Sequence, residues 1–217
     1  MMKLHILKFL LIGLALVAAG CSPQKGDDCG FVQNVYGQRI SWKRQLPLQV
    51  YVNSSVPAQL KPAIHRAAAT WEKNAGQKIF EIIEESSSSS TSPNMPSRDR
   101  KNGIYFLSNW ESDRQSEQGR TSVYWAGDEI QEADVRINAA NFGYYDQDPK
   151  NIVRITKSSN SSDGYNFEAL MLHELGHFLG LKHRESDGTV MATHLAPYND
   201  RVNLSQADAE SVQCEYK

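Results

Sequence analysis

The segment between His173 and His183 constrains this chain more than any other part of it. It reads H-E-L-G-H-F-L-G-L-K-H. His173 and His177 lie four residues apart, so on a helix they share one face and can bind one ion together. Glu174 follows about 100° further around the helix. Its carboxylate can therefore reach a water on that ion without being a ligand.

The glycine at position 180 explains how a third histidine could join the other two. Gly180 has no Cβ, accepts a left-handed backbone, and can end the helix and turn the chain back. His183 could then bind the same ion from another direction. Three neutral imidazoles leave one position open, which is the arrangement of a catalytic zinc site. The alternative is three core histidines, which would have to fit into an otherwise apolar segment.

This spacing resembles the signature H-E-x-x-H-x-x-G-x-x-H of the metzincin zinc endopeptidases. The resemblance implies that zinc is bound by the three histidines and that Glu174 is the general base and acid of peptide hydrolysis. It also places Met191 in a turn beneath the histidines, where an ordinary core methionine is the alternative. A gluzincin would need a downstream glutamate as its third ligand, which Gly180 and His183 disfavour.

Within the metzincins, the chain is most similar to the matrixins. This similarity implies that Tyr198, which follows Pro197, belongs to the wall of the main specificity pocket. Matrixins commonly carry serine after the third histidine, and this chain departs from them with Arg184. Vertebrate matrixins also hold a second, structural zinc. Because the two remaining histidines outside the first 20 residues, His65 and His194, lie far apart in sequence, we expect a single zinc.

The periodicity of the sequence and the resemblance to matrixins together imply an α+β fold. We expect a mixed, twisted sheet of about five strands with a backing helix and an active-site helix. A small C-terminal subdomain would hold the methionine turn and a terminal helix. The backing helix has Ser54 or Ser55 as its cap, Pro57 in its first turn and Gly76 at its end. The expected strands, by their periods and β-prone residues, are 48–52, 78–84, 103–108, 121–125 and 129–138.

Three further features complete this expected fold. Asn166 can cap the helix that carries the histidines, and Ser205 with Asp208 resembles a capping box for the terminal helix. Residues 152–156 could add a short strand. Asp146 and Asp148 could hold calcium, but the absence of a full set of oxygen ligands favours a solvated loop.

The chain has 217 residues, 40% hydrophobic content and a formal net charge of −2. These values predict one compact domain over residues 47–217, with a mobile serine-rich loop at 85–102. The chain has no long run of basic residues, so a nucleic-acid partner is not indicated. We expect a monomer whose substrate is a protein or peptide in an extended conformation. The resemblance to matrixins implies that the strand at 121–125 is the edge strand that lines the cleft and binds this substrate, unless it is only a structural edge.

The first 20 residues have the features of an export signal. Two lysines precede an apolar run that is too short to span a membrane. The following Ala18-Ala19-Gly20-Cys21 resembles the lipobox of bacterial lipoproteins, although leucine is usual where Ala18 stands. This resemblance implies a lipid on Cys21 and a polar tether within 21–46. The protein would then lie in the cell envelope, with the outer membrane favoured. An ordinary secretory signal is the alternative.

Two cysteines remain, Cys29 and Cys214. In an oxidising compartment a disulfide between them is the simple interpretation. By analogy with matrixin propeptides, Cys29 could instead cap the zinc as an inhibitory switch. The main alternative function from another class is a non-catalytic, zinc-stabilised binding lipoprotein of the envelope.

Overall fold

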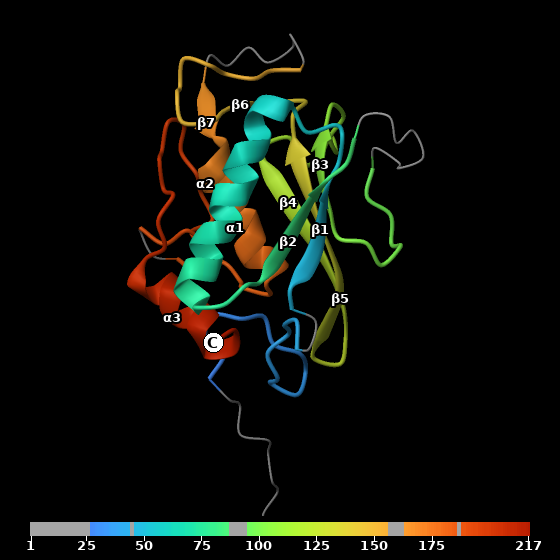
Figure 1. Ribbon diagram of the computed structural model, residues 1–217, viewed down its shortest axis with the longest axis vertical. Helices are drawn as coiled ribbons and strands as arrows, with labels where there is room; N and C mark the ends of the chain where they lie inside the picture. Colours follow the sequence, from blue (N-terminus) through green and yellow to red (C-terminus); the bar gives the residue numbers. More distant parts are fainter. Residues whose placement is uncertain (1–26, 44–45, 87–94, 156–162, 186–187) are drawn as a thin grey trace, which may run out of the picture.

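The computed structural model describes residues 27–43, 46–86, 95–155, 163–185 and 188–217 (Figure 1). The expected signal segment, the lipidation site Cys21 and most of the serine-rich stretch lie outside these ranges. Within them, no helix is both long enough and apolar enough to cross a membrane.

A five-stranded mixed sheet forms the framework, as the sequence predicted. Its order is β2-β1-β3-β5-β4, and only β4 runs antiparallel to its neighbour. The strand β4 therefore lies at one edge of the sheet. The bounds are Leu48–Val52 for β1, Phe80–Glu84 for β2, Gly103–Leu107 for β3, Gly119–Ala126 for β4 and Glu129–Asn138 for β5.

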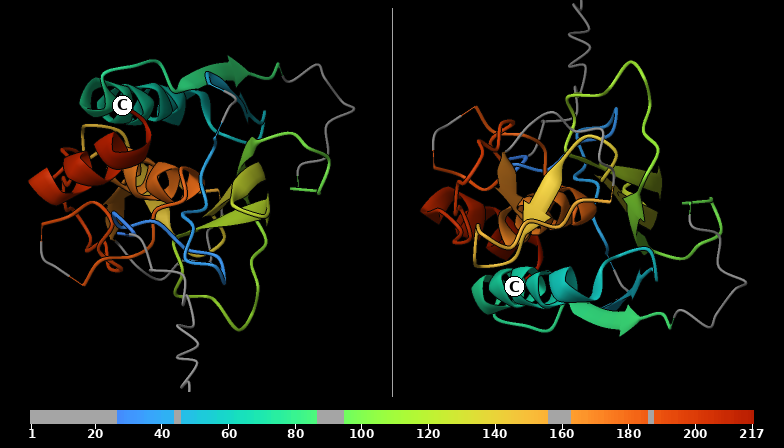
Figure 2. Two further views of the ribbon diagram at one scale, coloured as in Figure 1. Left: turned by 90° about the horizontal axis from the view of Figure 1, so that it is seen from below. Right: turned by 90° about the horizontal axis from the view of Figure 1, so that it is seen from above.

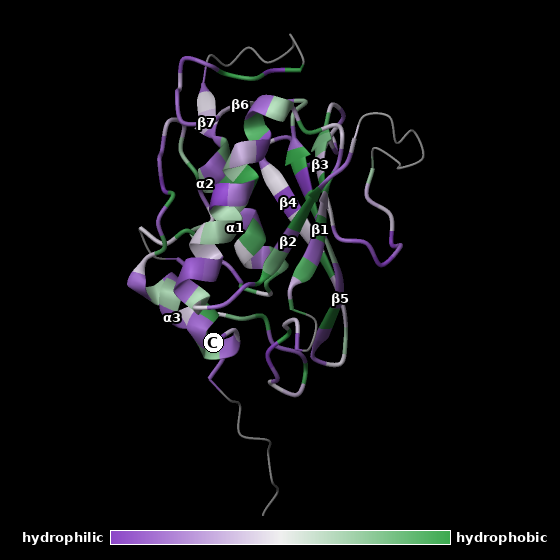
Figure 3. Cartoon of the chain, in the orientation of Figure 1, coloured by the Kyte–Doolittle hydropathy of each residue, from purple (hydrophilic) through white to green (hydrophobic). Residues whose placement is uncertain are grey.

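Three helices lie on one side of this sheet (Figures 1 and 2). They are α1 (Lys61–Ala75), α2 (Phe167–Phe178) and α3 (Gln206–Glu215). Hydrophobic and hydrophilic residues alternate along α1 (Figure 3), because only one face of this helix meets the core. Nearly every residue of α2 is buried, since α1, β4 and β5 all pack against it. The helix with the histidine motif is thus the centre of the core.

The start of α1 differs from the prediction. Neither Ser54 nor Ser55 caps it, because Pro57 instead precedes a 3₁₀ turn at Ala58–Leu60. The α-helix follows with Pro62 in its first turn, where a missing N–H costs nothing. Gly76 ends the helix in a left-handed conformation, with φ 74°, as expected.

The connection between β5 and α2 also differs. Two short strands, β6 (Gly143–Tyr145) and β7 (Gly164–Asn166), pair in parallel as a separate small sheet. Residues 152–155 are not a strand, since only Val153 makes an isolated bridge, to Tyr144. Asn166 caps α2 as expected, because its side chain accepts the N–H of Ala169.

The capping box predicted for the terminal helix is confirmed at the start of α3. Ser205 accepts the backbone N–H of Asp208, and the Asp208 carboxylate accepts the N–H of Ser205. Near the other end, the Tyr216 hydroxyl donates to the carbonyl of Leu179 at 2.7 Å and accepts the N–H of Trp42. These contacts tie α3 to the end of α2.

Residues 31–41, which we call the N-terminal ribbon, pack against the core. The ribbon folds back on itself through a bridge between Gln33 and Arg39. Its first residue pairs with the segment after α2, and its last with the start of β5 at Glu129. Phe31 and Ile40 are buried. The ribbon thus contributes to the core from Phe31 onward.

A disulfide joins Cys29, just before the ribbon, to Cys214 in α3. It links residues 185 positions apart and so closes most of the chain into a loop. In this state Cys29 has no free thiol to offer a metal.

We expect Cys29→Ser with Cys214→Ser to lower the free energy of unfolding by about 2–5 kcal/mol, because the open chain gains conformational freedom when unfolded. Denaturant titration of oxidised protein measures this loss. A reductant should destabilise the wild type by a similar amount and leave the double variant unchanged. Equal stability of oxidised wild type and variant would contradict the expectation.

Candidate zinc centre

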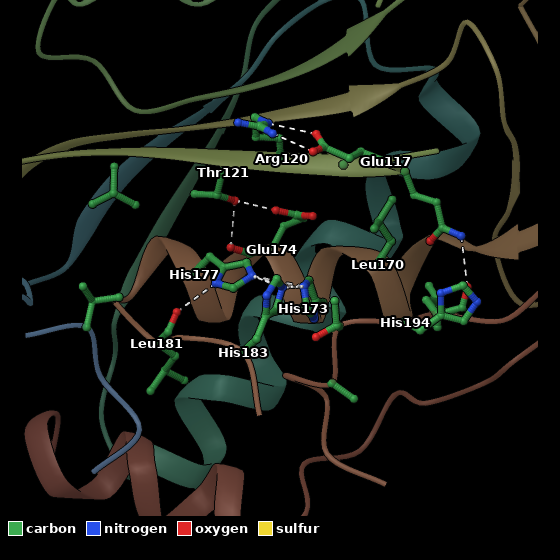
Figure 4. A pocket seen from close by; sticks show the side chains of 18 of the residues that line it. Glu117, Arg120, Thr121, Leu170, His173, Glu174, His177, Leu181, His183 and His194 are labelled. Carbon is green, nitrogen blue, oxygen red and sulfur yellow. Dashed lines mark hydrogen bonds and ion pairs between the residues drawn. The ribbon is translucent and has the colours of Figure 1, made fainter. Parts of the chain in front are cut away.

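Three imidazole nitrogens converge at the end of α2 (Figure 4). The Nε2 atoms of His173, His177 and His183 lie 3.0–3.2 Å from one another. Zinc–nitrogen bonds of about 2.0–2.1 Å at tetrahedral angles place ligand nitrogens about 3.3 Å apart. Among the described residues, these three form the one group of three or more His, Cys, Asp or Glu side chains close enough to share an ion. The spacing therefore fits a zinc ion.

The other nitrogen of two of these rings is held by a main-chain carbonyl. His173 Nδ1 lies 2.7 Å from the oxygen of Val190, and His177 Nδ1 lies 2.8 Å from that of Leu181. A carbonyl can only accept, so both Nδ1 atoms carry the proton and both Nε2 lone pairs point at the shared site. This fixes the tautomer that a metal requires.

Burial also favours the neutral form of the rings. It lowers the pKa of His173 to about 3 and that of His177 to about 4, and it lowers the pKa of the more exposed His183. Neutral imidazoles are the form that binds metal. The chemistry of the donors thus agrees with their spacing.

Met191 lies against α2 beneath the histidines. A Cβ added at Gly176 would come within 2.2 Å of the Met191 sulfur and 3.0 Å of Trp71. Only glycine therefore allows the thioether to approach the helix this closely. Met191 is almost fully buried, and its carbonyl accepts the N–H of Arg184. The turn that holds this methionine is thereby joined to the segment that carries His183.

Gly180 serves two purposes in the structure. Its φ of +104° lets the chain leave α2 and turn, as the sequence predicted. In addition, a Cβ here would come within 2.2 Å of the carbonyl oxygen of Ile40, in the N-terminal ribbon. The ribbon pairs with this turn, because Val32 donates to Gly180 and Lys182 donates to Gly30, both at 2.9 Å. The backbone leading to His183 is thus held from the N-terminal side.

Glu174 is buried next to the edge strand, and its carboxylate faces β4 (Figure 4). Burial raises its pKa to about 7, against the opposing effect of a hydrogen bond from Thr121. The Thr121 hydroxyl lies 2.7 Å from Oε2. A Cβ at Gly119 would come within 2.7 Å of Oε1, so glycine leaves this second oxygen uncovered.

The histidines and Glu174 lie in a cleft of about 620 Å³ between α2 and β4. Alternate residues of β4 line it, namely Thr121, Val123 and Trp125. The remaining lining comes from the N-terminal ribbon, α2 and the turn after it, the loop before β4, the first two residues of β4 and the segment that follows Met191. These residues are Val32, Ile40, Ser116, Glu117, Gln118, Gly119, Arg120, Leu170, Gly180, Leu181, Ala192, Thr193, His194 and Leu195.

The structure places Tyr198 elsewhere. It is not among the residues that line the cleft, and its ring stacks on Tyr145 with centroids 6.2 Å apart. The pocket role expected for Tyr198 therefore has no support in the lining. Arg184, the departure from the matrixin pattern, donates to Ser211 of α3 at 2.7 Å.

The two aspartates considered as calcium ligands, Asp146 and Asp148, have other partners in the structure. Asp146 forms an ion pair with Arg66, and Asp148 accepts the backbone N–H of Lys150. His65 pairs with Glu84 on the surface, away from the three histidines.

Sequence reasoning missed two groups of cleft residues. Thr121 was expected as a strand residue, but its hydrogen bond to Glu174 was not foreseen. The alternation along β4 that points Thr121 into the cleft was the available signal. Val32 and Ile40 gave no such signal, because the N-terminal ribbon has no clear period and its pairing partners, Leu181 and Glu129, lie far away in the sequence.

Gly180→Ala should lower both stability and zinc content. The methyl group adds a collision with the ribbon to the cost of a left-handed backbone, which alone is about 1 kcal/mol. Gly76→Ala is the matched control, since its φ is +74° but its Cβ would meet nothing within 4 Å. Thermal unfolding and metal analysis measure the two effects. Equal losses in both variants would show that the ribbon does not restrict position 180.

Comparison with known proteins agrees with this geometry. The sequence profile of the matrixin family matches residues 45–217, which is most of the chain and includes the three histidines, Glu174 and Met191. No curated protein matches the chain. The mixed five-stranded sheet with its helices is consistent with the catalytic domain of the metzincins. The chain therefore belongs to the matrixin family of metallopeptidases, within the metzincin clan.

Proposed function

We propose that this chain is a zinc-dependent endopeptidase that hydrolyses peptide bonds in protein substrates. One observation carries the proposal. Three neutral imidazole nitrogens converge beside a separate buried carboxylate, within an open cleft bordered by a sheet edge. A purely structural zinc site would be closed by a fourth protein ligand.

His173, His177 and His183 would hold the zinc, and Glu174 would move the proton. When bound, zinc supplies a Lewis acid that acidifies water and polarises a carbonyl group. Thr121 holds Oε2 of Glu174, which leaves Oε1 to accept a proton from the attacking water. Glu174 then delivers this proton to the amine nitrogen of the leaving group. A carboxylate whose pKa is near 7 is suited to both transfers.

The free edge of β4 would bind the substrate backbone. This strand pairs with β5 on one side only, so its other side carries peptide groups that are not used in the sheet. An extended peptide can pair with such an edge and add a strand. Because Thr121 on this strand also touches Glu174, the same edge would align the substrate backbone with the reacting groups.

We further propose that the chain works as an exported, monomeric lipoprotein attached to the cell envelope through Cys21. The lipobox-like sequence supports the attachment, and the disulfide between Cys29 and Cys214 fits an oxidising compartment. A labelled fatty acid should be incorporated by the wild type and not by Cys21→Ser. Equal labelling of the two chains would refute the anchor.

Glu174→Ala should keep one zinc per chain and lose at least about 10²-fold in hydrolysis of denatured casein, because it removes the general base. His183→Ala is the companion variant and should lose zinc together with activity. Metal analysis and casein hydrolysis, with and without a chelator, distinguish these outcomes.

Unchanged proteolysis in Glu174→Ala would exclude the proposed role of this residue. Two tightly held zinc ions per chain would contradict the single site. The alternative function, a non-catalytic binding lipoprotein, predicts that the wild type holds zinc but shows no hydrolysis that a chelator or a hydroxamate can block.

A further inference from the structure

The end of the N-terminal ribbon exposes two neighbouring apolar side chains to water. Residues 34–38, which we call the ribbon tip, read Asn-Val-Tyr-Gly-Gln and carry no charge. Val35 is 92% exposed and Tyr36 is 70% exposed, and no other large hydrophobic residue in the described ranges is exposed to this degree. An apolar phase that covered both side chains would remove this surface from water, which is favourable.

Hydrogen bonds hold the ribbon tip in its outward position. The carboxamide oxygen of Asn34 accepts the backbone N–H groups of Tyr36 and Gln38, both at 3.0 Å. The carboxamide nitrogen of Asn34 donates to the carbonyl of Gly127, in the turn that follows β4, also at 3.0 Å. The shape of the tip is therefore preformed, and little ordering entropy is lost when a partner surface covers it.

The ribbon tip lies at the end of the molecule where the anchor would join. The ribbon (blue) occupies the lower end of Figure 1, and the loop between β6 and β7 occupies the opposite end. Asp27, the first described residue, is fixed at the base of the ribbon, because Arg39 donates to its carbonyl at 3.0 Å. Asp27 follows Cys21 by six residues, which span at most about 20 Å in any conformation. A lipid on Cys21 would therefore keep this end of the protein close to the membrane surface.

Charged side chains around this end are paired with opposite charges. Arg39 and Lys43 both pair with Glu215, each at 2.7 Å. Lys182 pairs with Asp28 at 2.6 Å. With these pairs formed, the described residues of this end present no strong field of one sign. Neither repulsion from a bilayer nor a requirement for anionic lipids is therefore expected.

The two side chains of the tip suit the boundary between lipid headgroups and acyl chains. A tyrosine is favoured at this depth, because its ring is apolar while its hydroxyl can remain hydrated. The adjacent valine adds apolar area. A lipid on Cys21 would hold the tip near the bilayer, so even a weak attraction would act as an intramolecular equilibrium.

We propose that the ribbon tip docks on the lipid surface to which the chain is anchored, with Val35 and Tyr36 at the headgroup boundary. This inference rests on the proposed attachment through Cys21 and extends it from a tether to a fixed orientation. The same ribbon lines the cleft with Val32 and Ile40. Docking would therefore set the height and the orientation of the cleft above the bilayer.

A fluorescent label at the tip tests the inference in the lipidated chain. Val35→Cys supplies the one free thiol, because Cys29 and Cys214 form a disulfide and Cys21 would carry the lipid. On vesicles of phosphatidylethanolamine and phosphatidylglycerol, a nitrobenzoxadiazole label there should emit at shorter wavelength. A nitroxide near the top of the lipid acyl chains should quench it. Lys150→Cys is the matched control, because it is exposed in the loop at the opposite end, so its label should stay in water (Figure 1).

Tyr36→Asp supplies a second variant, because an ionised side chain resists transfer into lipid. Added to Val35→Cys, it should lower the ratio of docked to undocked tips about tenfold, as expected for the loss of about 60 Å² of apolar contact. Zinc content should not change, since the tip lies outside the cleft. Equal quenching at positions 35 and 150 would overturn the inference, and so would quenching that Tyr36→Asp leaves unchanged. A tip label that stays in water on vesicles but is shielded in intact envelopes would indicate a protein partner and overturn it too.

Fatty-acid labelling separates failure of the docking surface from failure of the anchor. If Cys21 is lipidated but the label at position 35 stays in water on vesicles, the anchor stands and the docking surface fails. If Cys21 takes up no fatty acid, the anchor fails, and the label is read on the unlipidated chain mixed with an excess of the same vesicles. A shift to shorter wavelength that Tyr36→Asp abolishes would then support the docking surface on its own. Emission typical of water would overturn it as well.

Discussion

Two hydrogen bonds from imidazole Nδ1 atoms to main-chain carbonyls determine how this molecule is organised. One links His173 to Val190 and the other links His177 to Leu181. Each bond fixes a tautomer, and each also fixes the position of a chain segment. Val190 precedes Met191, and Leu181 lies in the turn after Gly180. The carbonyls that hold the two rings therefore belong to two turns, one before Met191 and one after Gly180. Gly176 lets the first turn approach α2 closely, and Gly180 lets the second turn form.

The edge strand and the central helix share the second essential part of the site. Glu174 is buried, so its ionised form is costly unless a donor is provided. Thr121 provides it from β4, and Gly119 on the same strand leaves the remaining oxygen accessible. Register between helix and strand thus determines how readily the carboxylate can accept a proton. The shared contact also explains why a helix motif alone does not define the chemistry of this cleft.

Local patterns predicted much of this arrangement from the sequence. The histidine spacing, the strand periods and the capping box at Ser205 each depend on residues that are close together in the chain. The predicted start of α1 was wrong, because Pro57 suits the beginning of a 3₁₀ turn as well as the first turn of an α-helix. The N-terminal ribbon was not recognisable, since its partners are Gly180, Leu181 and Glu129. Pairing over such separations leaves no period in the sequence.

The anchorage of Arg184 has a consequence for the order in which the site can form. Its guanidinium donates to Ser211 of α3, six residues before Lys217, and packs against Gly30. The neighbouring His183 is therefore fixed only after both ends of the chain have reached the same place. During synthesis the ribbon, α1 and the sheet emerge before α3 exists. A nascent chain would thus carry all three histidines without their final alignment, and peptide hydrolysis would begin only when the last helix has docked.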